Sequence, residues 1–332
     1  NRLTATHTYE TSGAYAVSVR VTDETRGWDA ASEAVTVYAC ASHVYVSPTG
    51  RAEMPYDTPD KAANDVATAL SMLQAGSDGA AVLSLAEGVY KISQTVLSRK
   101  IRIVGEGREK TVLDFGRQTG FVLNHNGARL EDLCVSNAVG TAVQVSKGTV
   151  SGCAIRQIGG NDEWIQAHGL LLSGSQTAGD TCVATNCLVE DCVASTECAG
   201  AGVLIENGRG VLVDSTVRRC RAEAEKNSSW GGGVYVAGAG RVERCAIEDC
   251  YAYAQGGGVY VEGSSEARVV NCRIRRNSCS LWAGGGVRIK NVNAALVGCL
   301  ISENVRQTQG SGGGAGVYVD SGTLVNCTIA GN

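Results

Sequence analysis

The sequence predicts an all-β fold, a parallel β-helix, in which short strands stack coil upon coil. Apolar strand starts that follow small residues recur at steps of 31, 25, 28 and 30 residues: Val203, Val234, Val259, Val287 and Val317. A second apolar element follows each start by about ten residues. A period of about 20 to 50 residues indicates a solenoid, and these repeats lack the helical periodicity that helix-based solenoids require.

The glycine runs mark the corners of the coils. "GGGVYV" at 231–236 returns at 256–261, and "GGGVRI" follows at 284–289. A phosphate-binding glycine loop follows a strand and opens a helix, whereas each run here leads into a strand. We therefore expect tight turns, where positive φ or close backbone approach requires glycine.

The second element is seven residues long and alternates between inward and outward side chains. Its second residue is Cys or Ser and its fourth is Ile or Val, so both positions face the interior of the coil. It occurs as "GCAIRQI" from Gly152, "NCLVEDC" from Asn186, "DSTVRRC" from Asp214, "RCAIEDC" from Arg244, "NCRIRRN" from Asn271, "GCLISEN" from Gly298 and "NCTIAGN" from Asn326.

The charges of this element alternate from coil to coil. Its fifth residue is, in successive coils, Arg156, Glu190, Arg218, Glu248 and Arg275. Its sixth residue alternates in the same way: Gln157, Asp191, Arg219, Asp249 and Arg276. In-register parallel strands about 4.8 Å apart would place each arginine between two carboxylates, with like charges never adjacent. The pattern predicts a salt-bridge ladder that fixes the register, rather than a basic binding patch.

Fourteen cysteines are present, and most occupy inward positions of this repeat. Stacked side chains lie farther apart than the about 3.8 Å between Cβ atoms that a disulfide prefers, so buried free thiols are favoured. A disulfide among Cys192, Cys220 and Cys250 is the alternative. No C-x-x-C pair supports a zinc site. The column of these three cysteines continues as Asn277, Asn304 and Asn332, which predicts a turn where stacked asparagines take unusual backbone angles and bond to one another.

Residues 57–75 predict an amphipathic helix. Pro59 lies in its first turn, and Gly76 follows its end. One face carries its apolar residues: Ala62, Ala63, Val66, Leu70 and Leu73. A helix laid over the first coil would cover exposed core and unpaired strand edges, so we expect it to cap the solenoid.

Composition excludes several partners. The net charge of −4 and the pI of about 5.7 provide no positive field for nucleic acid or an anionic membrane. No apolar run of about 18 residues predicts a membrane-spanning helix. The chain begins at Asn1 and ends within a repeat, which predicts an excerpt of a longer polypeptide, and we expect a monomer.

The first coils resemble a known superfamily. "VYVSPTG" from Val44, the helix, "LAEGVYKI" from Leu85 and "IRIVGEGREKTVLDF" from Ile101 are similar to the amino-terminal cap and first coils of the pectin-lyase-like, right-handed parallel β-helix superfamily. The later repeats resemble those of bacterial secreted and surface proteins, including polymorphic outer-membrane proteins. The resemblance implies a β-helix over residues 40–332, with cap and first coils at 43–115 and repeats at 116–332.

Residues 1–39 resemble a different domain. "HTYETSGAYAVSVRVTD" at 7–23 and "ASEAVTVYA" from Ala31 are similar to the closing strands of a polycystic-kidney-disease (PKD) domain, an immunoglobulin-like β-sandwich. The fragment lacks the earlier strands, so we expect it to be less well ordered than the β-helix. Both resemblances imply export to the surface of a bacterium or beyond it.

The superfamily includes enzymes that depolymerise acidic polysaccharides, but their motifs are mostly missing. Ala167-His168-Gly169, Gly179-Asp180-Thr181 and Arg288-Ile289-Lys290 resemble pieces of the polygalacturonase-like pattern in the wrong order, without the second carboxylate. Asp162, Glu163 and His168 are the remaining candidate catalytic residues. The sequence indicates no cofactor, although a lyase of this superfamily would use Ca²⁺.

A better candidate surface lies on the strands after the glycine runs. Between two inward apolar residues, one outward residue per coil forms a column: Leu204, Tyr235, Tyr260, Arg288 and Tyr318. Trp230 and Trp282 lie in the preceding loops. Aromatic faces beside a cation suit a sugar ring and its carboxylate, so these residues are candidate glycan ligands. The alternative is a purely structural tyrosine ladder.

Three functions follow from these observations. We favour a surface adhesin or glycan-binding solenoid, because the repeats resemble those of secreted proteins and complete catalytic motifs are missing. A polysaccharide lyase or glycoside hydrolase acting on acidic polysaccharide, and a structural stalk or passenger segment, are the alternatives.

Overall fold

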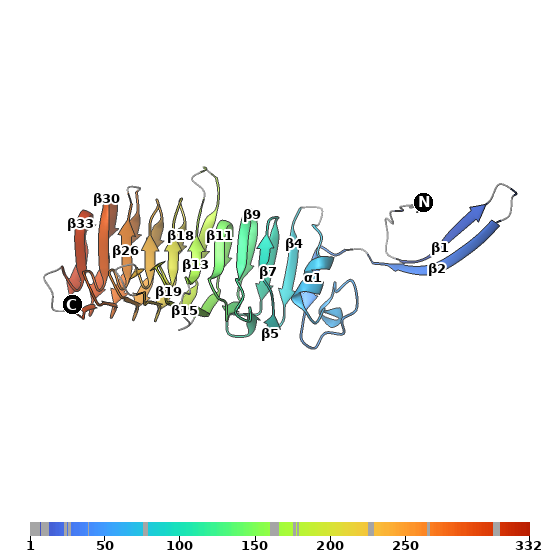
Figure 1. Cartoon of the computed structure of the whole chain (residues 1–332), viewed down its shortest axis with the longest axis horizontal. Coiled ribbons are helices and arrows are strands. Elements are labelled where there is room, and N and C mark those ends of the chain that lie inside the picture. Colours follow the sequence, from blue (N-terminus) through green and yellow to red (C-terminus); the bar gives the residue numbers. More distant parts are fainter. Residues whose placement is uncertain are drawn as a thin grey trace.

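The computed structural model describes residues 7, 13–22, 25, 28–38, 40–75, 79–159, 166–174, 177, 179–224, 229–263, 266–307 and 313–332. The described chain forms an elongated stack of coils, with a β-hairpin at its amino-terminal end (Figure 1). The predicted parallel β-helix is confirmed, since every strand pairing inside the stack is parallel.

The hairpin consists of β1 (Gly13–Thr22) and β2 (Trp28–Val37), which pair antiparallel. β1 lies inside the predicted segment 7–23, whereas β2 begins three residues before the predicted start at Ala31. Two strands alone cover little apolar surface, and Val19, Val21 and Trp28 remain 59%, 60% and 64% exposed.

The largest sheet contains sixteen strands among the described residues and includes the strands that follow the glycine runs. Its strands are β3 (His43–Val46), β4 (Ala81–Leu85), β6 (Thr95–Leu97), β7 (Ile101–Gly105), β9 (Phe121–Glu131), β11 (Thr141–Ser151), β13 (His168–Leu172), β14 (Cys182–Thr185), β17 (Val203–Ile205), β18 (Val211–Val213), β22 (Val234–Val236), β23 (Arg241–Glu243), β26 (Val259–Glu262), β27 (Arg268–Val270), β30 (Val287–Val297) and β33 (Val317–Val325).

A second sheet has fourteen described strands and contains the seven-residue elements. Its strands are β5 (Gly88–Lys91), β8 (Thr111–Asp114), β10 (Cys134–Ser136), β12 (Ala154–Gly159), β15 (Leu188–Ala194), β19 (Thr216–Arg218), β20 (Arg221–Ala222), β24 (Ala246–Glu248), β25 (Tyr251–Ala252), β28 (Arg273–Arg275), β29 (Ser278–Cys279), β31 (Leu300–Ser302), β32 (Val305–Arg306) and β34 (Thr328–Ala330). At one corner, β16 (Cys198–Ala199) and β21 (Ser229–Trp230) form a separate pair.

The predicted helix over 57–75 is shorter than expected. It divides into a 3₁₀ turn, η1 (Pro59–Lys61), and α1 (Val66–Met72), with Asp65 accepting a hydrogen bond from the Thr68 amide at the start of α1. Between them the chain is extended because Ala63 pairs with one edge of β3: its amide donates to Tyr45 O and its carbonyl accepts from Ser47 N. The predicted apolar face is still buried, with Ala63 and Val66 each 1% exposed. None of the described residues forms a helix with the length and apolarity needed to cross a bilayer.

Left-handed backbone turns bound each seven-residue element. In one coil, Asn186 and Asp191 have φ of 51° and 55°, and each of the other seven-residue elements likewise has positive φ at both its first and its sixth position. The prediction that Asn277 takes an unusual angle was wrong, because the turn falls one residue earlier, on Arg276 at φ 53°. The predicted asparagine ladder is present: Asn304 Oδ1 accepts from Asn277 N and Nδ2, both at 3.0 Å.

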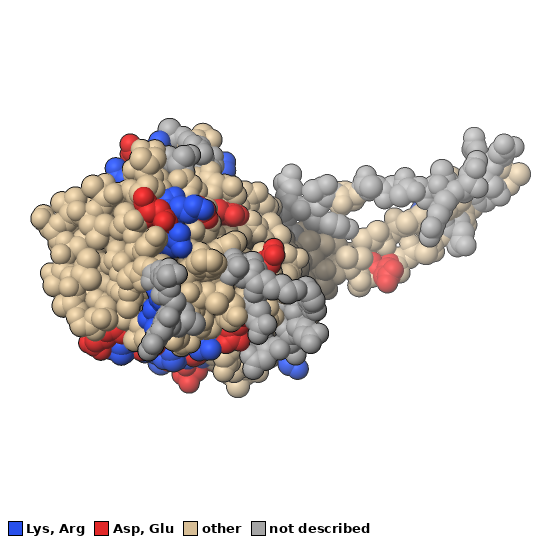
Figure 2. Space-filling view, turned by 60° about the vertical axis from the view of Figure 1, so that its left-hand side comes forward, with Lys and Arg blue, Asp and Glu red and all other residues tan. Residues whose placement is uncertain are grey.

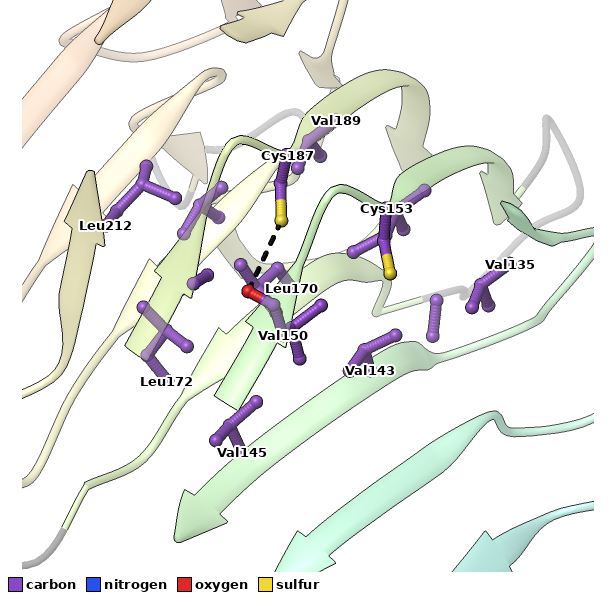
Figure 3. Packing of buried hydrophobic residues seen from close by; sticks show 14 of the residues in the cluster. Val135, Val143, Val145, Val150, Cys153, Leu170, Leu172, Cys187, Val189 and Leu212 are labelled. Atoms are coloured by element: carbon purple, nitrogen blue, oxygen red, sulfur yellow. Dashed lines mark hydrogen bonds between the residues drawn. The ribbon is translucent and has the colours of Figure 1, made fainter. Parts of the chain in front are cut away.

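The cysteines serve as small interior residues with a hydrogen-bond donor. All fourteen lie in the described chain as free thiols, and most are buried. Cys187 Sγ donates to Val150 O in the preceding coil at 3.7 Å, inside a core of stacked valines and leucines (Figure 3). It also donates to Thr185 O at 3.3 Å, and Ser215, the one serine of this column, makes the same bond to Val213 O at 2.8 Å. The second position of the element therefore requires a small side chain that can donate a hydrogen bond to the backbone carbonyl two residues earlier.

The charge ladder joins successive coils as predicted. Arg219 binds Asp191 with two bonds of 2.8 Å, and Arg276 binds Asp249 at 2.7 and 2.8 Å. Arg218 likewise forms an ion pair with Glu190 of the preceding coil, at 2.7 Å. Each of these arginines thus pairs with the carboxylate one coil earlier, which fixes the register of the sheet.

Candidate functional site

One outward column runs along the sheet that follows the glycine corners. Strand pairing connects the predicted members in the expected order, from Leu204 through Tyr235, Tyr260 and Arg288 to Tyr318. The same register extends the column towards the amino-terminal coils through residues that the sequence did not single out: Val96, Val122, Gln144 and Leu171. We call these nine residues the outer column.

The middle of the outer column is covered. Tyr235 and Tyr260 are only 8% and 2% exposed, and they pack with Leu204 in a cluster separate from the interior core. Their rings stack at 5.3 Å, and Trp230 stacks on Tyr260 at 6.4 Å. Both tyrosines point away from the interior, as expected, but their faces are not free for a ligand. The physical reason is that the two rings pack on each other and that Trp230, in the corner strand β21, packs against the same cluster.

Hydrogen bonds and burial fix these two tyrosines in place. The Tyr235 hydroxyl donates to Glu262 Oε2 at 2.9 Å, and Lys290 Nζ lies 3.1 Å from Glu262 Oε1. Burial, followed by the nearby Glu262 carboxylate, raises the pKa of both phenols. The pair therefore remains protonated over the physiological range and acts as part of the scaffold.

Arg288 and Tyr318, in the last coils, are less covered than the tyrosine pair. Arg288 is placed over the Tyr318 ring, with its guanidinium carbon 5.1 Å from the ring centroid. Nε and Nη2 of Arg288 donate to Asp320 Oδ2 at 3.0 and 2.7 Å. The arginine side chain is 14% exposed and its positive charge is already matched by Asp320. Arg288 is thus a stacking and hydrogen-bonding group rather than an unmatched cation.

Trp282 adds an accessible aromatic face nearby in the fold. It is 50% exposed at the corner that leads into β30, the strand that carries Arg288. We call Trp282, Arg288 and Tyr318, with the ion pairs Arg288–Asp320 and Glu262–Lys290, the exposed strip. The four charges of the strip cancel. Figure 2 likewise shows positive and negative side chains gathered beside one another on the surface around this end of the solenoid.

The candidate catalytic residues do not form an accessible group in the described chain. Asp162 and Glu163 lie outside the described residues. His168 is 6% exposed, and its Nδ1 lies 3.0 Å from Gly200 O and 4.0 Å from Cys198 Sγ. Burial lowers the pKa of His168 and raises that of Cys198 to about 12, so both are neutral near pH 7. Four strand steps separate β13 from β30, which places His168 about 19 Å from the Arg288 strand.

Potential metal ligands occur throughout the part of the chain that the structure describes. In that part of the chain, no three His, Cys, Asp or Glu side chains converge as a metal site. The carboxylates at the strip are occupied by Arg288 and Lys290.

Comparisons with known proteins agree with the fold. The family described as "Right handed beta helix region" matches residues 119–332, more than half of the chain. No curated protein matches the sequence.

Among solved structures, a pectin methylesterase from Erwinia chrysanthemi is similar at 13% identity and a TM-score of 0.46, over 86% of this chain and 81% of that one. The Dettilon tailspike protein matches at 13% identity and a TM-score of 0.46, over 85% and 62%. A pectin methylesterase from Yersinia enterocolitica matches at 12% identity and a TM-score of 0.43, over 81% and 91%. Similarity at this level carries no information on activity or ligand.

Proposed function

The chain belongs to the right-handed β-helix family, and on this scaffold we propose that the exposed strip binds a neutral polysaccharide. The observation that carries the proposal is the combination of exposed Trp282 with the Arg288–Tyr318 stack and two ion pairs. Aromatic faces pack against the apolar faces of pyranose rings, while charged side chains donate to and accept from hydroxyl groups.

The charge balance favours a neutral glycan over an acidic one. Arg288 and Lys290 already pair with Asp320 and Glu262 at 2.7 and 3.1 Å. A uronic-acid polymer would have to compete with these carboxylates and would meet their repulsion. A neutral sugar can hydrogen-bond to the pairs without breaking them.

We place the protein outside the cell, on a bacterial surface, where a rigid solenoid presents the strip as an adhesin. Residues 1–39 would belong to a PKD-like sandwich, and the β-helix would act as a monomer. A lyase or hydrolase, with Ca²⁺ in the lyase case, is the alternative that depends on Asp162, Glu163 and His168. A stalk without ligand is the other.

Affinity electrophoresis tests the proposal. The wild type is run in gels that contain xylan, mannan, a soluble β-glucan or polygalacturonate, beside Trp282→Ala and Tyr318→Ala. Trp28→Ala is the matched control, since Trp28 is 64% exposed on the hairpin and outside the strip. We expect retardation by a neutral polymer that weakens about tenfold in the two strip variants and is unchanged in the control. Retardation equal in all four proteins would refute the site.

If no polymer retards the wild type, a structural stalk without ligand is the remaining interpretation. Release of unsaturated or reducing products from polygalacturonate would favour the enzyme.

A further inference from the structure

A hollow at the opposite end of the solenoid has the size and lining of a ligand site. It has a volume of about 420 Å³ and lies between α1, the turn after β5 and the turn after β8. The volume is over ten times the about 30 Å³ that one water occupies, and it falls in the range of small-molecule pockets. We call it the cap pocket. None of its lining belongs to the exposed strip.

The cap pocket has an apolar floor. Phe115, which is 1% exposed, is anchored in the core by edge-to-face packing on Phe121, with ring centroids 5.3 Å apart. Leu70 of α1 and Ile92 after β5 pack against the same core from two sides. The floor is therefore made by three segments that pack against the interior.

Polar groups of both kinds line the walls. Asp114 Oδ1 accepts from Asn137 Nδ2 at 2.8 Å and from Gly116 N at 2.9 Å, and Asp65 Oδ1 accepts from Thr68 N at 2.7 Å. Each carboxylate is thus oriented through one oxygen, and in the described chain no hydrogen bond is made to the second. Lys91 lies opposite Asp114 in the strand register. Gln94 and Gln118 add amides that both donate and accept.

This lining selects the chemistry of the ligand. Carboxylates only accept hydrogen bonds, an ammonium group only donates, and amides do both, so a ligand with many neighbouring hydroxyls satisfies all of them. An anionic ligand would meet two carboxylates against one lysine. An apolar floor beneath such walls matches the C–H face of a pyranose ring and the hydroxyl groups around its edge. We propose that the cap pocket binds a neutral saccharide of one or two rings.

The cap pocket lies near the amino-terminal end of the outer column, far from the exposed strip. The turn that contains Phe115 leads into β9 and Val122, and the turn that contains Ile92 leads into β6 and Val96. Six strand steps separate Val122 from Arg288, or about 29 Å. A disaccharide therefore reaches the cap pocket or the strip but not both, so the two proposals are tested separately.

Saturation-transfer NMR on the whole chain with cellobiose, mannobiose and digalacturonic acid tests the cap pocket. We expect transfer to a neutral disaccharide and an affinity that falls about tenfold in the double variant Gln94→Ala, Gln118→Ala. Ala67→Trp, which fills the pocket from the exposed face of α1, should abolish the signal. Gln74→Ala is the matched control, because Gln74 is exposed beside α1 and does not line the pocket.

Each other outcome contradicts the proposal. No transfer to either neutral disaccharide at millimolar concentration would overturn the site, whatever the strip binds. Stronger binding of digalacturonic acid would overturn the charge argument. A signal that survives Ala67→Trp but is lost in Trp282→Ala would place the sugar on the strip instead. Circular dichroism of each variant confirms that the fold is retained.

Discussion

Glu248 is the residue whose replacement tests the charge ladder most sharply. It is 8% exposed and accepts from three guanidinium groups, those of Arg273 at 2.8 Å, Arg275 at 3.1 Å and Arg276 at 3.3 Å. Burial alone would raise the pKa of Glu248, but the hydrogen bond from Arg275 and the charge of Arg273 together hold it below its usual value. Glu248→Gln keeps the shape and removes the charge that all three share.

The expected loss follows from how exposed the partners are. The arginine side chains are 52%, 32% and 38% exposed, so water replaces much of what they lose. Arg276 also keeps Asp249 at 2.7 Å. Exposed ion pairs contribute about 0.2–1 kcal/mol each to the free energy of unfolding, and pairs with a buried carboxylate such as Glu248 contribute somewhat more. We therefore expect Glu248→Gln to lower the free energy of unfolding by about 1–3 kcal/mol.

Urea unfolding at pH 7, followed by circular dichroism, measures this loss as a lower midpoint with an unchanged slope. Asp214→Asn is the control, because Asp214 forms a similar two-bond pair with Arg244 at 2.7 and 3.0 Å but is about half exposed. Its midpoint should move less. An unchanged midpoint in Glu248→Gln would refute the ladder as a source of stability.

Acid should remove the same contribution. Hydrogen bonds from Arg219 and Arg276 lower the pKa of Asp191 and Asp249, and that of Glu248 is lowered as well. A carboxylate whose pKa is lower in the folded than in the unfolded protein stabilises the fold at pH values above its unfolded pKa of about 4. This stabilisation is lost as the pH falls through the pKa of the folded state. The midpoints of wild type and Glu248→Gln should therefore converge as the pH falls below the folded pKa of Glu248. A gap that stays constant from pH 7 to below that pKa would contradict the electrostatic origin.

Three further predictions concern packing. Gly257→Ala should lower the free energy of unfolding by about 2–4 kcal/mol, because its Cβ would lie 2.1 Å from Ser278 O. Gly116→Ala has open space around its Cβ, but its backbone is left-handed, so urea unfolding should show a loss of only about 1 kcal/mol. Native thiol titration should label exposed Cys40 and half-buried Cys327 and spare the other twelve until urea is added; more than two fast thiols would contradict the packing. Tyr260→Ala should lower the free energy of unfolding by about 3–5 kcal/mol, and a stable variant that only lost glycan binding would show that its face is a ligand site.

The sequence predicted the register of the coils because register depends on local alternation. The order of Arg218 and Glu248 along the chain places opposite charges one coil apart, and any slip by one residue would turn Val217 and Ile247 outward. The outward direction of Tyr260 follows from the same alternation. These features needed no knowledge of how distant segments pack.

The features that sequence did not predict depend on long-range contacts. Trp230 stacks on Tyr260 of the following coil, and nothing in "GGGVYV" indicates this contact. The helix is shorter than the apolar pattern of residues 57–75 predicts, because Ala63 pairs with β3. The cap pocket joins residues near 65, 92 and 115, which have no common motif.

The most direct test of the proposed function is the affinity of the wild type for a neutral polysaccharide and for a uronic-acid polymer at about 0.05 and about 0.5 M NaCl, since salt screens exposed charges over this range. We predict that the neutral polymer binds at both salt concentrations with similar affinity, because the ion pairs of the strip are matched within the protein. Binding only to the uronic-acid polymer, and only at low salt, would contradict the proposal.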